Sequence, residues 1–320
     1  MTMGLRQCLG LREHVENDEN VLVPNLMETS MSTSPVQATK DRDQTVRQSA
    51  RTKHHYNNIK NLTPSQRACG ALYALKVTHN GWKRRLLEIY ANDTDSLLDI
   101  ACGRGGDIMK WNDCRIKMVH GVDISLYEVR EAVRRASNIK RPYTTCTFQI
   151  HDFLMPYTPL LSFATVSTFF CLHYFCVSKY ACQTLLESIE RSLCVGGHWI
   201  GICLDSHKVT QWITEGKTSP HLTITNVSIG NSSHGFGQAY TYNLKETVTA
   251  PVSGDHGSLE YLVPWKQVVT MAEDVGLVCT YIKPCPVPES SYPGSEASEM
   301  CMAFSFTKLE SCDDQWMTSA

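Results

Sequence analysis

The sequence predicts an α/β protein with a mostly parallel, Rossmann-like sheet covered by helices on both faces. Three observations support this. Strand-like and helix-like stretches alternate from about residue 65 to 204. An apolar run enters a glycine-rich turn in "LLDIACGRGGDIMKW", residues 97–111, and an aspartate ends each of the next two strand-like runs, "KMVHGVD" and "TFQIHD". Alternation of this kind is typical of βαβ units, whose strands pair in parallel.

The elements follow from this alternation. A helical pattern comes first, then the apolar run before the turn predicts a strand, and the turn opens a helix. Further strands and helices follow, with "CVGGHW" separating a helix from the next strand. We expect helices over 65–90, 105–112, 125–138, 178–193 and 264–275, and strands over 96–101, 117–123, 145–151, 163–170, 197–204, 277–283 and 301–308.

The ends of the chain and one internal segment differ from this pattern. Residues 1–50 are poor in aromatic residues and rich in Ser, Thr, Asp, Gln and Arg, which predicts a disordered N-terminal tail. Residues 51–310 form the predicted domain, and 311–320 a flexible C-terminus. The pattern loosens after residue 204, so we expect an insertion over about 214–262 that contains a short β-hairpin.

Composition and charge exclude several classes of protein. A content of 42% apolar residues in 320 is ample for a core, and a net charge of −2 excludes a generally basic polyanion binder. The fourteen cysteines lack zinc-site spacing, so no metal is expected. The charged N-terminus does not resemble a signal peptide, and no apolar stretch is long enough to span a membrane. We therefore expect an intracellular protein with reduced thiols and no membrane partner.

The glycine turn and the acids near it predict the ligand. The run "ACGRGGD" lacks the dinucleotide pattern GxGxxG but would still let the backbone approach a nucleotide-like ligand. Asp99 could anchor the turn, Asp123 could hold both ribose hydroxyls, and Asp152 could accept from an adenine amino group. Either strand-end aspartate alone would more often be an ordinary turn residue. Together they fit an adenosyl ligand without a diphosphate, most commonly S-adenosylmethionine, and thus a class I methyltransferase fold.

Five stretches occur in a characteristic order: "HHYN" (54–57), "HNGWKR" (79–84), "LLDIACGRGGDIMKW" (97–111), "FFCLHYF" (169–175) and "LEYLVPW" (259–265). They resemble the motifs HYN, FNNWxK, LDLGCGKGGDLLKW, QFVCHYSF and PEFLVYF of one family of such enzymes, the messenger-RNA cap guanine-N7 methyltransferases. The resemblance covers about residues 54–308, and its third stretch is highly specific.

The resemblance implies S-adenosylmethionine as the methyl donor, with S-adenosylhomocysteine as the product. Arg84 stands where the family has the lysine that contacts the donor, and Gly103 and Asp107 would line its methionine end. Ala101 and Phe169 occupy donor-contacting positions where the family has a glycine and a glutamine.

The resemblance also implies the residues that hold the cap. Asn80 would touch the cap, and Arg104 would reach its phosphate bridge. Phe170 would stack on guanine or its ribose, with Tyr242 as a further aromatic. His173 would lie near the guanine O6, beside Tyr174, and Glu260 would accept from N1–H and the amino group.

The implied reaction transfers a methyl group to N7 of the cap guanosine in GpppN. Guanine N7 has a lone pair and no proton, so no general base is needed and catalysis reduces to alignment and electrostatics. We therefore expect no acid–base residue, but positioning by Phe170, His173 and Tyr174.

The departures from the family pattern leave two other functions open. Ala101 costs stability only if its φ is positive, and Phe169 removes a hydrogen-bond partner of the donor. Arg84 keeps the charge but not the geometry of lysine, so its role could pass partly to Lys83. The family's late tyrosine aligns with Cys301. The alternatives are a methyltransferase of this fold with another acceptor, and an inactive scaffold subunit of a capping complex.

The implied partners are 5′-capped RNA and the proteins that make it. A tail of fifty residues is too short for a guanylyltransferase domain, so we expect the guanylyltransferase and triphosphatase on other chains. The tail could dock to one of them or to RNA polymerase. The expected site of action is the nucleus, or the cytoplasm for a viral protein.

Overall fold

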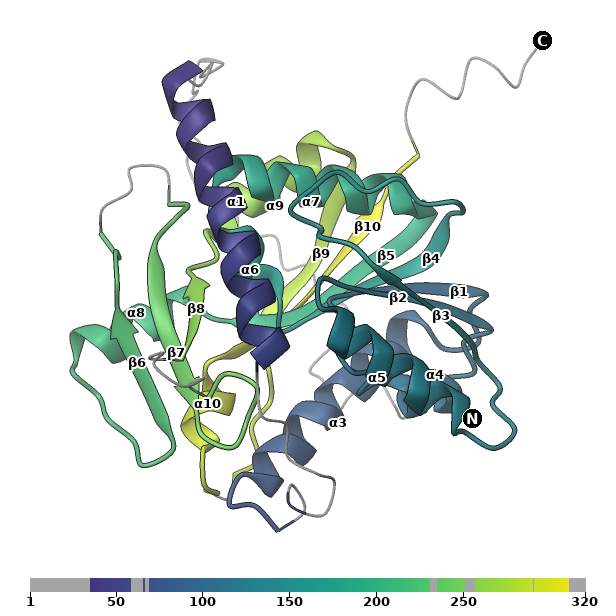
Figure 1. Ribbon diagram of the computed structural model, residues 1–320, viewed down its shortest axis with the longest axis horizontal. Coiled ribbons are helices and arrows are strands. Elements are labelled where there is room, and N and C mark those ends of the chain that lie inside the picture. Colours follow the sequence, from purple (N-terminus) through teal and green to yellow (C-terminus); the bar gives the residue numbers. More distant parts are fainter. Residues whose placement is uncertain are drawn as a thin grey trace, which may run out of the picture.

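A seven-stranded sheet forms the centre of the computed structural model (Figure 1), which describes residues 35–58, 66, 69–230, 235–250, 257–289 and 291–310. The strand order is β3-β2-β1-β4-β5-β10-β9. All neighbours pair in parallel except β10, which is antiparallel to both β5 and β9. The strands are β1 (Ser96–Ile100), β2 (Met118–Asp123), β3 (Thr145–Ile150), β4 (Phe163–Phe169), β5 (Leu193–Leu204), β9 (Leu277–Pro284) and β10 (Cys301–Lys308).

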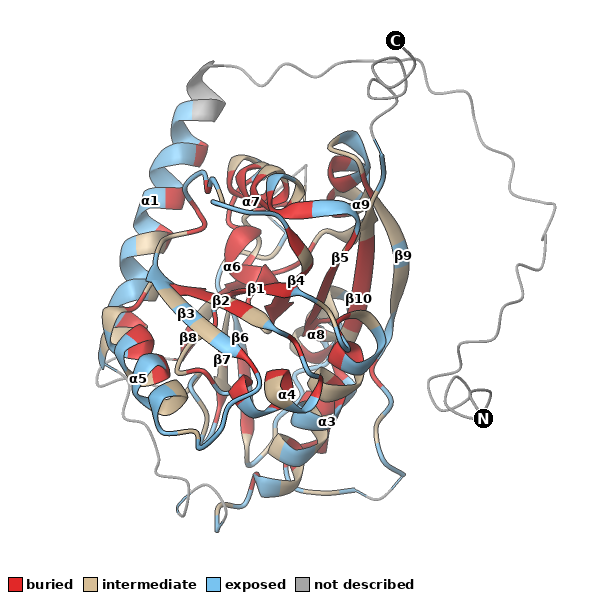
Figure 2. Ribbon diagram, turned by 90° about the vertical axis from the view of Figure 1, so that its right-hand side faces the viewer, coloured by how far each residue is buried: buried red, intermediate tan, exposed pale blue. Residues whose placement is uncertain are grey.

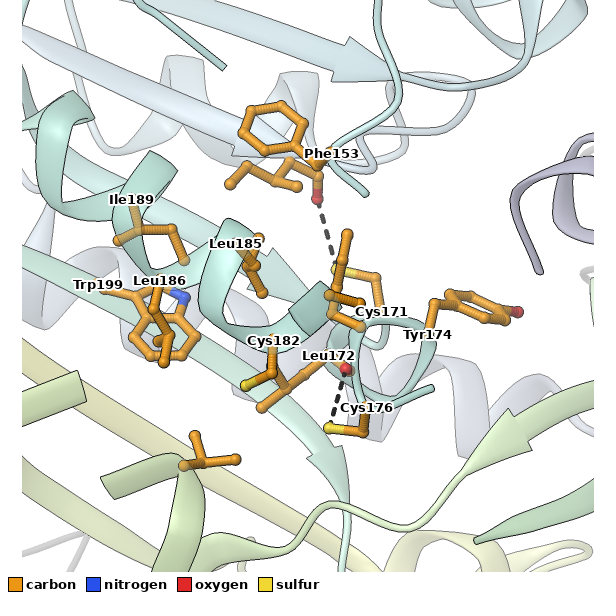
Figure 3. Close-up of a cluster of buried hydrophobic side chains, with 14 of the residues drawn as sticks. Phe153, Cys171, Leu172, Tyr174, Cys176, Cys182, Leu185, Leu186, Ile189 and Trp199 are labelled. Atoms are coloured by element: carbon orange, nitrogen blue, oxygen red, sulfur yellow. Dashed lines mark hydrogen bonds between the residues drawn. The ribbon is translucent and has the colours of Figure 1, made fainter. Parts of the chain in front are cut away.

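Helices pack on both faces of this sheet, as the sequence predicts. Along β1, Leu97 belongs to one hydrophobic core and Leu98 and Ile100 to another, because successive side chains of a strand point to opposite faces. Figure 3 shows part of the second core, where Leu186 and Ile189 lie near Trp199. The helices are α1 (Pro35–Asn58), α3 (Tyr73–Tyr90), α4 (Ile108–Asp113), α5 (Leu126–Ser137), α6 (Leu172–Phe175), α7 (Lys179–Ser192), α8 (Ser206–Thr214), α9 (Trp265–Asp274) and α10 (Ser295–Glu299). None of those described is long and apolar enough to cross a membrane.

The segment expected as an insertion contains a second, three-stranded antiparallel sheet. Its strands are β6 (Leu222–Asn226), β7 (Ala239–Leu244) and β8 (Ser258–Tyr261), in that order. The hairpin expectation accounts for β6 and β7. The third strand places Glu260 opposite Tyr240 in the register of β7 and β8.

Helix α1 corrects the predicted tail boundary at residue 50. Residues 35–50 are helical and run beside the domain (Figures 1 and 2), whereas residues 1–34 and 311–320 lie outside the described part. The helix docks largely through polar side chains. Thr45 Oγ1 lies 3.0 Å from Ser178 Oγ, and Tyr261 Oη donates to Gln48 Oε1 at 3.1 Å. The polar composition of residues 35–50 suggests disorder because these residues can bury little apolar surface, but the helix is held by hydrogen bonds instead.

Other boundaries differ where tertiary contacts decide them. Helix α3 begins at Tyr73 rather than residue 65, and the short helices α8 and α10 were not expected. Strand β4 ends at Phe169, so His173 and Tyr174 lie on the one-turn helix α6 and not on a buried strand. The change of direction occurs at Phe170, whose φ of +59° is left-handed.

Ala101 also has a positive φ, of 59°, so its methyl group strains the turn after β1. We expect Ala101→Gly to raise the free energy of unfolding by about 1 kcal/mol, because glycine adopts this conformation without a Cβ clash. Urea unfolding with an unchanged m-value measures this. As a control, Ala50→Gly on the exposed side of α1 should lower stability by about 1 kcal/mol. A less stable Ala101→Gly variant would contradict the assigned backbone conformation.

Candidate active site

A cavity of about 1590 Å³ opens past the carboxyl ends of β1, β2 and β4, with residues of α1, α3 and the small sheet also in its wall. Its volume exceeds the roughly 300–1,000 Å³ typical of a pocket for one small ligand, so two ligands fit better than one. Every predicted site residue except Asp152 lines it, namely Asn80, Arg84, Asp99, Ala101, Gly103, Arg104, Asp107, Asp123, Phe169, Phe170, His173, Tyr174, Tyr242 and Glu260.

Asp152 is engaged elsewhere. Its carboxylate accepts from Ser49 Oγ on α1 and, at 2.9 Å, from the backbone N–H of Leu154. Asp152 thus holds the part of α1 that lay in the predicted tail, and its side chain does not reach the cavity wall.

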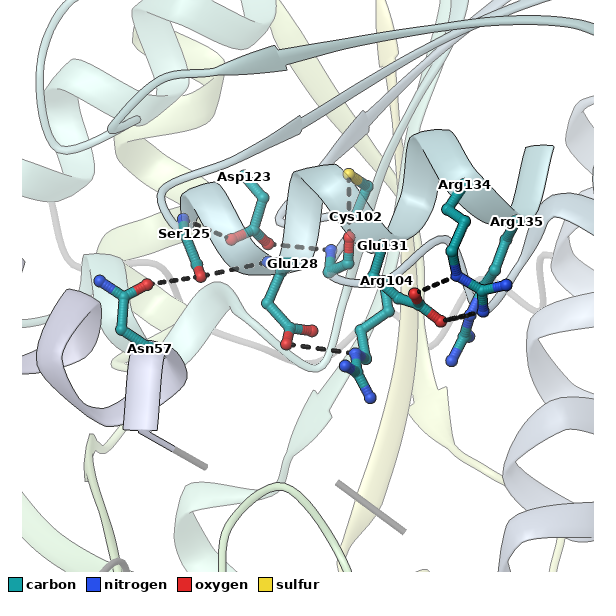
Figure 4. Close-up of polar contacts among 10 residues, drawn as sticks. Asn57, Cys102, Arg104, Asp123, Ser125, Glu128, Glu131, Arg134 and Arg135 are labelled. Atoms are coloured by element: carbon teal, nitrogen blue, oxygen red, sulfur yellow. Dashed lines mark hydrogen bonds and ion pairs between the residues drawn. The ribbon is translucent and has the colours of Figure 1, made fainter. Parts of the chain in front are cut away.

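Asp123 ties the glycine turn to the end of β2 (Figure 4). One carboxylate oxygen accepts from Gly103 N at 2.9 Å, and the other accepts from Ser125 N at 2.8 Å. Burial raises the pKa of this carboxyl, against these backbone hydrogen bonds, which lower it. Each carboxylate oxygen can accept more than one hydrogen bond, so Asp123 retains capacity toward a ligand.

Lys83 lies at the end of the cavity that contains Asp99 and Asp107, called here the acidic end. Its ammonium lies 2.8 Å from Asp107 Oδ2, and Lys110 Nζ lies 2.6 Å from Asp107 Oδ1. Burial alone would lower the pKa of Lys83, but the neighbouring Asp107 raises it overall. Burial would raise the pKa of Asp107, but Lys83 and Lys110 outweigh it and keep that pKa low. Burial and Asp107 raise the pKa of Asp99 to about 7.

Arg84, the residue predicted to contact the donor, lies at the rim. Its guanidinium pairs with Asp113 at 2.6 Å, and 41% of its side chain is exposed. The Lys83 ammonium, in contrast, lies 5.2 Å from the Phe169 ring centre and 5.7 Å from that of Phe170. The rings of Phe169 and Phe170 thus present aromatic faces to the Lys83 ammonium, an arrangement that attracts a cation.

A stack of three rings supports Phe170. The imidazole of His79 is nearly parallel to Phe170 at 5.0 Å and to Trp82 at 4.9 Å between ring centres. Burial, followed by Lys83, lowers the pKa of His79 to about 3, so the ring is neutral. Trp82 is a buried core residue whose indole N–H donates to Pro286 O at 2.8 Å. The stack holds Phe170 at its strained backbone position.

His173, Tyr174 and Glu260 form a second polar group in the wall. His173 Nε2 lies 3.7 Å from Glu260 Oε1, and burial lowers the pKa of His173 to about 3, so this is no ion pair near neutral pH. Both ring nitrogens lack a hydrogen-bond partner within the described part of the chain. Burial raises the pKa of Glu260 to about 8, against a hydrogen bond from Tyr240 Oη at 3.1 Å.

Tyr174 is fixed from two sides. Its hydroxyl lies 2.9 Å from the hydroxyl of Tyr56 on α1 and 2.8 Å from Ser258 Oγ on β8. Helix α1 therefore contributes to the site through the tyrosine of the "HHYN" stretch, to which sequence reasoning assigned no role.

Two arginines line the cavity beside α5. Arg104 Nε lies 3.3 Å from Glu128 Oε1, and Arg135 Nε lies 2.8 Å from Glu131 Oε1 (Figure 4). Glu128 and Arg135 were not predicted. Both residues lie on α5, the helix that follows the Asp123 strand, and they are seven residues apart, which puts them on one face of the helix. This spacing is a signal that could have identified them. Among the described residues, no group of three or more His, Cys, Asp or Glu side chains could hold a metal ion.

The raised pKa of Glu260 predicts a pH-dependent stability. Between the ordinary value of 4.5 and about 8, the unfolded chain loses this proton while the folded chain keeps it, so stability falls as pH rises. We expect the fall to be smaller in Glu260→Gln, by up to about 1.4 kcal/mol per pH unit, because Asp99 and Glu128, whose pKa values burial raises to about 7, contribute to it in both proteins. Urea unfolding across this pH range measures the difference. The exposed control Glu273→Gln should follow the wild type, and identical curves for Glu260→Gln and wild type would contradict the assignment.

Comparison with known proteins agrees with the predicted family. The "mRNA cap guanine-N(7) methyltransferase" of Cryptococcus neoformans is 26% identical over 250 residues, covering 72% of this chain and 38% of that protein. The Saccharomyces cerevisiae protein of the same name is 27% identical over 290 residues, covering 79% of this chain and 61% of that protein. The chain thus spans less than two thirds of the length of these relatives.

The fold agrees with a solved structure as well. A SAM-dependent methyltransferase from Methanosarcina mazei superposes with a TM-score of 0.50 at 14% identity, covering 71% of this chain and 98% of that one. This confirms the predicted fold class. The model of the mRNA (guanine-N(7))-methyltransferase domain matches residues 38–287, a span that starts inside α1. The chain belongs to the mRNA (guanine-N(7))-methyltransferase domain family.

Proposed function

We propose that this protein transfers a methyl group from S-adenosylmethionine to N7 of the terminal guanosine of a 5′ cap, GpppN. The observation that carries the proposal is that one cavity is lined by two different groups of residues. One is the glycine turn with Asp123, suited to an adenosyl ligand. The other is the His173–Glu260 pair with Tyr174, suited to the edge of a base.

The donor would lie along the turn. Asp123 would hold the ribose, and the backbone at Ala101 and Gly103 would lie close to the ligand. Lys83, paired with Asp107, would bind the carboxylate of the methionine part, a role that Arg84 at the rim is less well placed to fill. When bound, S-adenosylmethionine supplies a methyl group activated by its sulfonium. Asp152 has no part in this proposal.

The acceptor guanine would lie between the small sheet and α6. Glu260 would accept from N1–H and the amino group, and these donors favour its charged form despite burial. Tyr240 would help to hold the charged carboxylate in place. The free ring nitrogens of His173 would serve the O6 side, while Phe170 and Tyr242 would contact the base or ribose. Asn80 would touch the cap, and Arg104 and Arg135 would face its phosphates.

The chemistry asked of these residues is positioning. Guanine N7 needs no deprotonation, and His173 stays neutral near pH 7, so it adds no positive charge beside an acceptor that becomes positive on methylation. Tyr174, fixed by Tyr56 and Ser258, would keep the two ligands aligned.

The proposal also places the protein in a reaction sequence. GpppN ends are the product of triphosphatase and guanylyltransferase reactions, so enzymes of these classes must act before this one. We propose the nucleus as the site of action, since transcripts are capped as they are made there. No metal is included in the proposal.

Transfer of label from radiolabelled S-adenosylmethionine to GpppA-capped RNA tests the function. We expect the label on guanine N7 after digestion of the RNA. Binding of S-adenosylhomocysteine without transfer to the cap would indicate another acceptor. Loss of both would indicate a scaffold subunit, and either result would overturn the proposal.

A matched pair of variants tests which cation binds the donor. Lys83→Met should weaken S-adenosylhomocysteine binding about tenfold, because a charge-assisted hydrogen bond is lost at a buried position. Arg84→Met should change it less than about twofold, because its ion pair with Asp113 is exposed. Calorimetric titration measures both affinities, and thermal unfolding shows whether each variant is folded. A larger loss of S-adenosylhomocysteine affinity in Arg84→Met than in Lys83→Met would show that Arg84, and not Lys83, binds the donor.

A further inference from the structure

Helix α1 carries a line of exposed positive side chains along one flank. Its docked face presents Asp41, Thr45, Gln48 and His55, all buried. Lys40, Arg47 and Arg51 are exposed and follow one another at intervals of seven and four residues, which places them on the same side of the helix. We call Lys40, Arg47 and Arg51 the basic stripe of α1.

The basic stripe carries a surplus of positive charge. Within the described part of the chain, none of its three side chains forms an ion pair with an aspartate or glutamate. Asp43, the one exposed acid of α1, lies beside the stripe between Lys40 and Arg47, so three positive charges face one negative charge on this flank. The whole chain has a net charge of −2, so this concentration of positive charge is local. Unpaired cations in a line attract an extended polyanion.

The stripe leads to the cavity. Farther along the same flank, His54 and Asn58 line the cavity. The neighbouring Asn57 accepts a hydrogen bond from Ser125 Oγ at 2.7 Å, which joins the end of α1 to the start of α5. Figure 4 shows Asn57 joined to Ser125 in the same group of polar residues as the Arg104–Glu128 pair. Arg104 and Arg135, proposed for the phosphate bridge, lie in the cavity wall, and the basic stripe of α1 continues the positive charge away from the cavity.

We propose that the basic stripe binds the backbone phosphates of the nucleotides that follow the cap. The inference rests on the proposed function, because it needs the capped end to lie in the cavity. From Lys40 to Arg51 the helix rises about 16 Å, enough to accompany a few nucleotides of a single strand. Contacts of this kind are made to phosphates and not to bases, so the stripe adds affinity without sequence preference. It makes the RNA body, and not the cap alone, part of the substrate.

The test compares a long and a short substrate. Steady-state methyl transfer is measured with GpppA dinucleotide and with a GpppA-capped single-stranded RNA of twenty nucleotides. We expect Arg51→Gln to raise KM for the capped RNA about threefold, and Arg47→Gln/Arg51→Gln about tenfold, with a shallower salt dependence of KM. KM and kcat for the dinucleotide should stay unchanged, which also shows that the variants are folded.

Lys53→Gln is the matched control. Lys53 is exposed on the same helix but lies about 200° around its axis from Arg51. Its substitution by glutamine therefore removes one positive charge from another flank. Its KM for capped RNA should equal that of the wild type. An equal effect of Lys53→Gln and Arg51→Gln would show that net charge, and not the stripe, is responsible, and would overturn the inference.

The remaining outcomes separate this inference from the proposed function. If the wild-type protein methylates neither substrate, the proposed function fails. If it methylates both and the stripe variants change neither KM, the inference alone fails. If the stripe variants lose binding of a phosphoserine peptide, followed by fluorescence anisotropy, but keep the wild-type KM for capped RNA, the stripe docks a phosphorylated protein and the inference is wrong.

Discussion

The site depends above all on the two backbone hydrogen bonds accepted by Asp123. One fixes the amide of Gly103 in the turn after β1, and the other fixes the amide of Ser125 at the start of α5. A single buried carboxylate thereby sets the separation of two neighbouring strand ends, the place where ligands bind in open parallel sheets. Arg104 and Glu128 take their positions from the same two segments. The strain at Ala101 is tolerated because the turn is held from outside.

Ion pairing sets the charges at one end of the cavity, and burial sets them at the other. At the acidic end, Lys83 and Lys110 keep Asp107 charged, so the wall offers an ammonium beside aromatic rings. At the other end, burial keeps His173 neutral and raises the pKa of Glu260, which leaves hydrogen-bonding groups without a fixed charge. The first end suits a zwitterionic ligand, and the second suits a neutral base.

Helix α1 joins these parts, although its residues 35–50 lie outside the predicted domain. Ser49 binds Asp152 after β3, Asn57 binds Ser125 after β2, and Tyr56 reaches Tyr174 after β4. One helix thus spans three successive crossovers of the sheet at the rim of the cavity. Its inner face helps to build the site, and its outer flank bears the basic stripe. A change in how α1 docks would therefore affect both the cavity and the surface beside it.

The sequence by itself determined most of the sheet, the glycine turn and the acids Asp99 and Asp123 beside it, because apolar runs, glycine positions and strand-end acids are local signals. It also pointed to the guanine-edge residues through family motifs. Only the tertiary structure decided that Lys83 pairs with Asp107 inside the cavity while Arg84 lies at its rim, that Asp152 accepts a hydrogen bond from Ser49, and that residues 35–50 form a docked helix. These outcomes depend on hydrogen bonds and ion pairs between segments far apart in the chain, which local pattern and composition do not encode.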